Sequence, residues 1–219
     1  MNILTVDSAL RGCSAAIVRD DAVFARREQP TERGQATMLP SMVEAVLDDA
    51  RVLPAELDLI AATVGPGSFT GIRAALALAH GIGLAAGAPV IAVTVGEALA
   101  EALPHLGRRQ LWSAIDSLRG QVFLERAGSV LSVAPAHLPI PDGPVAIAGD
   151  AAIEVAARLA ARNVDVMLTD AKLPQPRHIA MAARRRHAGR LPPLAPQPLY
   201  VDPPAARLPA DGLRPPPLP

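Results

Sequence analysis

The chain has very few aromatic residues and a single cysteine. Phe, Trp and Tyr make up 2% of its 219 residues, so a hydrophobic core must be built mainly from the aliphatic residues within the 50% hydrophobic content. Small aliphatic side chains bury little area each, and the elements that carry them must therefore pack closely. The lone Cys13 excludes an internal disulfide and a metal site made of several cysteines, and it fits a reducing cytoplasm.

Net charge is also absent. The 21 basic residues balance the 21 acidic ones, which argues against a broad basic surface for nucleic acid and leaves RNA contact through a partner open. Four arginines cluster near the end of an expected helix, where the helix dipole favours cations. Direct contact of these arginines with RNA phosphates is the alternative interpretation, and it stays open. They are Arg184, Arg185, Arg186 and Arg190.

Long uncharged hydrophobic runs are missing too. Asp7 and Arg11 interrupt the N-terminal segment, so we expect no signal peptide. The longest apolar stretch, residues 72–95, contains Arg73 and Pro89, and predicts a buried helix, a turn and a strand rather than a membrane span. We therefore expect a cytoplasmic protein without a membrane anchor.

Hydrophobic patterning predicts an α/β protein made of two related halves. In the first half we expect strands at 3–8, 14–19, 22–29, 57–64 and 90–95, and helices at 35–52 and 69–86. In the second half we expect strands at 111–115, 121–126, 129–133, 145–148 and 164–168, and helices near 151–162 and 179–188. Three strands followed by alternating helices and strands predict a mixed sheet covered by helices, in a ribonuclease-H-like order.

A short repeat supports this division. Asp7-Ser8-Ala9-Leu10-Arg11-Gly12 is echoed by Asp116-Ser117-Leu118-Arg119-Gly120, and each copy follows an apolar strand. We expect an N-terminal lobe at 1–103, a smaller C-terminal lobe at 104–190 and a proline-rich tail at 191–219. That tail has 11 prolines in 29 residues, which removes backbone donors and forbids helix interiors, so we expect it to be extended or disordered beyond Asp202.

The most informative string is Gly65-Pro66-Gly67-Ser68-Phe69-Thr70-Gly71-Ile72-Arg73, between an expected strand and an expected helix. Its glycines permit positive φ and close approach, and Ser68 or Thr70 could cap a helix whose free N–H groups attract anions. It is neither a P-loop nor Gly-x-Gly-x-x-Gly. By physical reasoning alone, a structural turn and a ligand loop fit it equally.

The same string resembles the signature of the TsaB (YeaZ) family of tRNA threonylcarbamoyladenosine biosynthesis proteins. Three weaker matches lie in the same order along the chain, from Met1 to about Tyr200: the segments 1–9, 114–123 and 198–200. The resemblance implies a two-lobed actin-like ATPase fold. It also implies a non-catalytic partner that binds and activates TsaD, which transfers threonylcarbamoyl to the adenosine next to the anticodon of tRNAs.

The resemblance further implies TsaE as a third partner, a homodimer when the chain is alone, and indirect contact with tRNA. The alternative is a stand-alone ATPase or phosphotransferase of the actin and sugar-kinase fold, with a peptidase as a remote third. The five histidines include no pair at i, i+4 spacing, and Ser68 has no recognisable His and Asp partners. We therefore predict no metal site and no catalytic residue.

In the superfamily that this family resembles, paired aspartates hold magnesium and nucleotide phosphates. The corresponding candidates form a vestigial nucleotide or phosphate site at Asp7, Ser8, Gly65, Gly67, Ser68 and Asp116. The competing interpretation is that the two aspartates stabilise turns at strand ends. We expect no cofactor, with weak or interface-shared binding of ATP or ADP with magnesium as the remaining option.

Two helices are candidates for a partner surface. An apolar stripe of the first helix lies beside its core-facing stripe, and the second helix has a smooth face of small side chains that permits close helix approach. Both helices being enclosed within their own lobe is the competing interpretation, and the resemblance favours the partner surface. We expect an exposed patch formed by Met38, Met42, Ala45, Thr70, Arg73, Ala74, Ala77 and Gly81.

Overall fold

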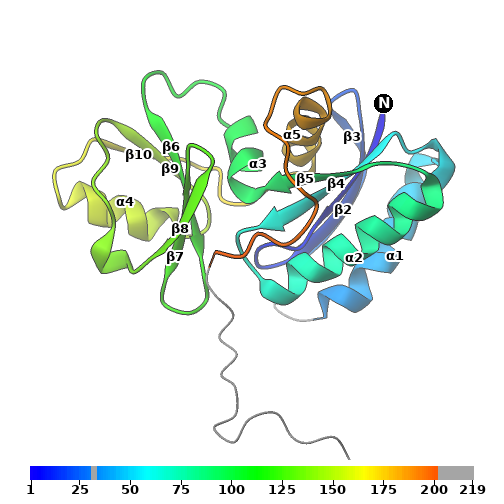
Figure 1. Ribbon diagram of the computed structural model, residues 1–219, viewed down its shortest axis with the longest axis horizontal. Coiled ribbons are helices and arrows are strands. Elements are labelled where there is room, and N and C mark those ends of the chain that lie inside the picture. Colours follow the sequence, from blue (N-terminus) through cyan, green and yellow to red (C-terminus); the bar gives the residue numbers. More distant parts are fainter. Residues whose placement is uncertain (31–33, 202–219) are drawn as a thin grey trace, which may run out of the picture.

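The computed structural model describes residues 1–30 and 34–201, and its strands form two five-stranded sheets (Figure 1). The first part contains β1 (Asn2–Asp7), β2 (Cys13–Arg19), β3 (Ala22–Gln29), α1 (Gln35–Ala50), β4 (Leu59–Gly65), α2 (Phe69–Ala86), β5 (Val90–Thr94) and α3 (Val95–Glu101). The second part contains β6 (Gln110–Asp116), β7 (Val122–Arg126), β8 (Ser129–Val133), β9 (Val145–Ala148), α4 (Ala152–Ala160), β10 (Val166–Leu168) and α5 (Pro176–His187). Short 3-10 turns lie at Pro54–Glu56 and Pro135–His137.

The two sheets have the same topology. Their strand orders are β3-β2-β1-β4-β5 and β8-β7-β6-β9-β10. In each sheet the first strand is central, antiparallel to the second strand and parallel to the fourth. This repetition confirms the predicted two-lobed α/β architecture with mixed sheets and flanking helices, and it places the two echoed motifs at equivalent strand ends.

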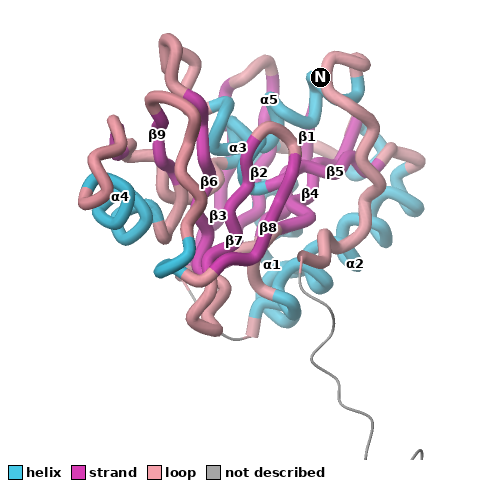
Figure 2. The backbone as a smooth tube through the Cα atoms, turned by 60° about the vertical axis from the view of Figure 1, so that its left-hand side comes forward, coloured by secondary structure: helices cyan, strands magenta, loops and turns pink. Residues whose placement is uncertain are grey.

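The first sheet is covered on both faces. Helices α1 and α2 lie side by side on one face, and α5 lies on the other (Figures 1 and 2). Successive strand residues point to opposite faces, so Leu4 joins the core with Leu39 of α1, whereas its neighbour Ile3 packs with Ile179 of α5. The two helices predicted to form a partner surface, α1 and α2, therefore make up one layer of a three-layer lobe.

Helix α5 differs from the predicted division of the chain. The predicted second lobe, 104–190, included this helix, yet α5 packs on the first sheet. Its Ile179 and Ala183 are buried against Leu59 and Val93 of the first sheet. Without α5, this apolar face of the sheet would be exposed to water. The chain thus returns to the first lobe before its C-terminal segment.

Helix α3 is not predicted by the hydrophobic pattern, which indicates a strand at 90–95 as the last element of the first lobe. Thr94 caps this helix by accepting from the Glu97 N–H at 3.0 Å, and Glu97 accepts from the Thr94 N–H at 2.8 Å. This reciprocal pair is a capping box. The Thr-x-x-Glu spacing was therefore the overlooked sequence signal.

The second lobe has a smaller core, which surrounds the buried Trp112 and includes Leu124 and Leu159. Helix α4 covers its sheet. Among the described helices, α2 alone has the length and hydropathy of a membrane span, but Ile72, Leu76 and other residues of its inner face are buried against the first sheet. Its composition therefore has an explanation as a core helix.

Candidate functional site

The glycine turn between β4 and α2 is pressed against the loop that follows β1. Gly67 has φ of 151°, and a Cβ atom there would lie 2.0 Å from the Ala9 carbonyl oxygen. The next residue, Ser68, donates its N–H to that same oxygen at 2.7 Å. Gly71 is equally confined, because its Cβ would lie 2.1 Å from the Ser8 carbonyl oxygen. These glycines are required by close backbone packing.

Ser68 is the N-cap of α2. Its hydroxyl accepts a hydrogen bond from the Gly71 N–H at 3.1 Å, which decides between the two capping candidates in favour of Ser68 over Thr70. Gly65 precedes the turn with φ of 109° and is buried. The hydroxyl of Ser8 donates to the Gly12 carbonyl at 3.2 Å and so closes the β1–β2 loop.

Asp7 stands at the end of β1 and is buried. Its Oδ1 accepts from the Ala9 N–H at 3.0 Å and from the Thr63 hydroxyl. Burial raises the pKa of the Asp7 carboxyl, although both hydrogen bonds oppose that change. The side chain therefore holds a turn and a neighbouring strand, as the structural interpretation of the sequence predicted.

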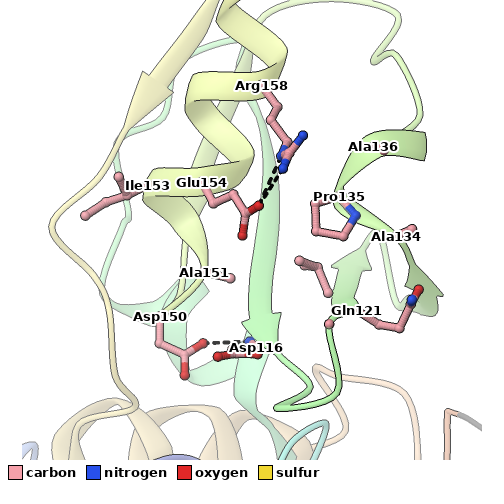
Figure 3. Close-up of a pocket in the computed structure, with 12 residues that line it drawn as sticks. Asp116, Gln121, Ala134, Pro135, Ala136, Asp150, Ala151, Ile153, Glu154 and Arg158 are labelled. Atoms are coloured by element: carbon pink, nitrogen blue, oxygen red, sulfur yellow. Dashed lines mark hydrogen bonds and ion pairs between the residues drawn. The ribbon is translucent and has the colours of Figure 1, made fainter.

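Asp116 occupies the equivalent position at the end of β6. Its Oδ1 accepts from the Leu118 N–H at 2.8 Å, which repeats the Asp7–Ala9 bond two residues along the chain. Its backbone N–H donates to Asp150 Oδ1 at 2.9 Å, and burial raises the pKa of the Asp150 carboxyl (Figure 3). The repeat is thus a repeat of turn chemistry.

A cation already lies between the two motifs. Arg11 Nη2, from the first lobe, lies 3.4 Å from Asp116 Oδ2 in the second. Both carboxylate oxygens of Asp116 are engaged, one by the Leu118 N–H and the other by this guanidinium, so a magnesium ion bound there would meet a competing cation. Over residues 1–30 and 34–201, His, Cys, Asp and Glu side chains form no group of three suited to a metal. These residues therefore fit a magnesium–nucleotide site poorly.

A cavity of about 670 Å³ opens in the second lobe beside Asp116 (Figure 3). Asp150, just before α4, and Glu154 and Arg158, on α4, line it from one side, and Gln121 lines it from the opposite side (Figure 3). Glu154 and Arg158 form an ion pair at 2.9 Å, so the charged groups of the wall engage one another. A smaller cavity of about 120 Å³ lies beside Asp7.

Helix α2 presents an outer face of small and apolar side chains to solvent. Thr70, Ala77 and Gly81 are exposed as predicted, and Leu84 beside them is 88% exposed. A Cβ at Gly81 would meet no atom within 4 Å. Ala74 is half-buried, between this face and the core.

The prediction that residues of α1 belong to the exposed patch is wrong for Met42 and holds only in part for Met38 and Ala45. Met42 is buried, and its sulfur lies 3.6 Å from the Cys13 sulfur. Met38 packs against the same core and is half-buried, as is Ala45. The second stripe of α1 therefore faces largely inward, because α1 packs on both β2 and β3.

Arg73 of α2 is held by two aromatic rings. Its guanidinium carbon lies 3.7 Å from the centre of the Phe69 ring and 5.5 Å from that of Tyr200. Its Nη2 and Nε donate to the Tyr200 hydroxyl at 2.6 and 3.1 Å. Phe69 and Arg73 are four residues apart on the helix, which is the only sequence signal for this cluster.

Glu125 is a buried acid that pattern analysis overlooked. It lies on β7 in the second lobe, yet it accepts from the Thr94 hydroxyl and, at 2.9 Å, from the Gly96 N–H of α3. Burial raises the pKa of Glu125 to about 7, although these two hydrogen bonds and the positive charge of Arg186 act to lower it. A Glu inside the buried strand sequence Val-Phe-Leu-Glu-Arg was the available signal.

The basic cluster on α5 forms ion pairs within the chain. Arg184 pairs with Asp21 at 2.8 Å, Arg185 with Glu101 and Arg186 with Glu97. Arg186 also donates to the carbonyl oxygen of Ala92, on β5. These contacts fasten α5 to the first lobe, which neither sequence interpretation foresaw. Contact between these arginines and tRNA stays the untested alternative.

The chain is similar in sequence to proteins of tRNA threonylcarbamoyladenosine biosynthesis. Residues 29–188 match the protein family described as "TsaD: tRNA N6-adenosine threonylcarbamoyltransferase". The tRNA threonylcarbamoyladenosine biosynthesis protein TsaB of Escherichia coli is 33% identical over 124 residues, and that of Bacillus subtilis is 32% identical over the same length. Each match covers 56% of this chain and 53% of the relative, so it spans about half the length of these curated proteins.

Solved structures match over nearly the full chain. YeaZ from Pseudomonas aeruginosa superposes with a TM-score of 0.71 at 25% identity, covering 91% of this chain and all of that one. A second Pseudomonas aeruginosa structure, described as similar to peptidase YEAZ, has a TM-score of 0.75 at 25% identity and covers 92% of this chain and 99% of that one. These neighbours share both lobes with the present structure.

Proposed function

Because this chain belongs to the TsaB (YeaZ) family, within the wider family described as tRNA N6-adenosine threonylcarbamoyltransferase, we propose that it serves tRNA threonylcarbamoyladenosine biosynthesis as a partner of TsaD. In this role it binds and activates TsaD, which carries out the threonylcarbamoyl transfer to the adenosine next to the anticodon. TsaE is the third member of the assembly, and tRNA is contacted through the complex.

The outer face of α2 is the observation that carries this proposal. Ala77 and Gly81 leave the helix backbone open to close approach, and Leu84 and Phe69 are 88% and 52% exposed beside them. Contiguous apolar surface on a folded chain marks an interaction site. A second helical protein of the same fold could pack its own helices against this face, because small residues permit short interhelical distances.

The engagement of the polar site residues supports a non-catalytic role. Asp7 and Asp116 each accept a backbone N–H two residues further on, and Ser68 caps α2. These bonds give each side chain a defined part in holding a turn or a helix start. The same side chains therefore have structural roles that need no chemistry.

Direct association with TsaD is the test. Purified chain and TsaD from the same organism are mixed and run on a size-exclusion column with light scattering. We expect a complex whose mass equals the sum of its subunits. Without TsaD, we expect the chain to elute as a homodimer. Separate elution of the two proteins at micromolar concentrations, under conditions where both are folded, would overturn the proposal.

A further inference from the structure

The C-terminal segment 191–201 is fastened along the outer side of the first lobe, and in Figure 1 it runs from α5 towards the start of α2. Arg186 Nε donates to the Pro192 carbonyl at 2.8 Å, and His80 Nε2 lies 2.8 Å from the Pro196 carbonyl. Leu199 donates its N–H to the Val64 carbonyl at 2.8 Å. The segment thus has fixed contacts at both of its ends and in its middle.

These contacts bring the segment to the edge of the exposed face of α2. His80 and Arg73 are seven residues apart on the helix, so they lie on one side of it, and the segment contacts both. Pro196 contacts His80, and Tyr200 contacts Arg73. The segment therefore runs antiparallel to α2 and borders the surface formed by Ala77, Gly81 and Leu84.

Arg73 is oriented at this border, and no carboxylate of the described residues pairs with its charge. The ion pairs formed by residues 1–30 and 34–201 include no carboxylate on Arg73. Its two bonds to the Tyr200 hydroxyl and its stacking on Phe69 fix the plane of the guanidinium. A guanidinium has five N–H donors in a planar fork, so donors remain for another acceptor.

A partner that covers the α2 face must also cover this charge. Enclosing an unpaired guanidinium against apolar surface is costly, whereas a carboxylate matches its fork with two charge-assisted hydrogen bonds. Arg and Tyr are also the residue types enriched where interfaces gain most of their binding free energy. Exposure of Phe69 and Tyr200, at 52% and 57%, leaves the cluster open to such a partner.

We propose that Arg73, positioned by Phe69 and Tyr200, is the charged anchor of the α2 face and receives a carboxylate side chain of TsaD. This rests on the proposed function. Tyr200 acts through Arg73 and is a positioning residue, which gives the segment 191–201 a role in partner binding. The acidic partner residue and the apolar face together would set the orientation of the complex.

The experiment measures dissociation constants for TsaD by calorimetry, with wild-type chain and the variants Arg73→Ala, Tyr200→Phe and the double variant. Arg108→Ala is the matched control, since Arg108 is an exposed arginine on another part of the chain. We expect Arg73→Ala to weaken binding about tenfold or more, Tyr200→Phe to weaken it about threefold, and Arg108→Ala to stay within about twofold. Binding by Arg73→Ala within twofold of wild type would overturn the proposal.

Two further readouts separate positioning from simple structural loss. In the Arg73→Ala background, Tyr200→Phe should have no further effect; an unchanged threefold loss there would contradict the positioning role. Raising the salt concentration should weaken wild-type binding more than Arg73→Ala binding, and equal salt dependence would overturn the ion pair. Should Arg73→Ala not fold, Arg73→Gln takes its place. Absence of any binding by wild type would instead contradict the proposed function itself.

Discussion

Single residues around the glycine turn are held by contacts that leave no room for substitution. Gly67 and Gly71 touch the carbonyl oxygens of Ala9 and Ser8, and Asp7 accepts bonds from Ala9 and Thr63 in the same place. The family signature therefore maps onto the packing between two loops. Steric exclusion and helix capping explain the glycines and the serine of this motif, and neither needs a bound ligand.

The first prediction at this scale concerns Gly67. Gly67→Ala should lower the free energy of unfolding by about 2 kcal/mol or more, because the new Cβ meets the Ala9 carbonyl at a strained φ. Gly81→Ala is the matched control, since nothing lies within 4 Å of that position and alanine favours a helix. Denaturant unfolding should rank Gly81→Ala at or above wild type; equal stability of the two variants would contradict the packing argument.

The second prediction concerns Asp7 and nucleotide. Because the Asp7 carboxylate is buried and bonded, the isolated chain should show no magnesium-dependent ATP hydrolysis above that of a heat-denatured sample. Phosphate release is the measurement. Hydrolysis that follows the purified chain and disappears in Asp7→Asn would favour the phosphotransferase alternative.

The third prediction concerns Glu125, whose pKa rises from an ordinary 4.5 to about 7 in the fold. Between these two values the folded state keeps a proton that the unfolded state releases. The contribution of Glu125 to the free energy of unfolding is therefore fully present below about pH 4.5, falls as the pH rises towards 7, and levels off above pH 7. Facing charges include Glu97, which strengthens the shift, and Arg186, which weakens it.

The matched variant is Glu125→Gln, which cannot titrate. The wild-type free energy of unfolding should fall relative to that of Glu125→Gln by about 1–3 kcal/mol between pH 4.5 and pH 8. Urea unfolding at a series of pH values gives both curves. A constant difference between the two proteins over this interval would show that the fold does not raise the pKa of Glu125.

Among the elements, α2 has two distinct faces. Ile72, Ala75 and Leu76 are buried on the sheet, whereas Ala77, Gly81 and Leu84 are in water. Neighbouring α1 contributes less to the outer surface than its sequence predicted, since Met42 contacts Cys13 in the core. The proposed partner surface is therefore centred on α2 and on the segment 191–201 that borders it.

A fourth prediction belongs to this element. Ala77→Arg should keep the fold, because position 77 is exposed, and should abolish association with TsaD by placing a charge and a long side chain against an apolar partner. Ala157→Arg on the exposed side of α4 is the matched control. Circular dichroism and size-exclusion chromatography of each variant with TsaD are the measurements, and a folded Ala77→Arg that still co-elutes would place the interface elsewhere.

On the scale of the whole molecule, local patterns predicted most elements but few of the contacts between them. Alternation and turn residues gave strands such as Ala22–Gln29 and the helix Phe69–Ala86 correctly, and the Asp7 and Asp116 echo indicated the repeat. Contacts over long sequence separations were not predictable in this way. The Arg73–Tyr200 bonds join residues 127 apart, and Glu125 reaches α3 from another sheet.

The same limit explains the assignment of α5 and of Met42. Periodicity shows that a helix has an apolar side, but which sheet that side covers depends on the area each sheet leaves open. The first sheet needed a cover for Ile3, Leu59 and Val93, and α5 supplies it. The part of the predicted tail beyond residue 201 lies outside the described residues.

We propose that this chain activates TsaD without chemistry of its own, and the direct measurement is the rate of tRNA modification in a purified system. TsaD, TsaE, tRNA and the threonylcarbamoyl donor are kept constant, and the chain is added or withheld. We predict at least about a tenfold stimulation by wild type, none by Ala77→Arg, and no modification by the chain without TsaD. An unchanged TsaD rate on adding folded wild-type chain, or modification by the chain alone, would contradict the account.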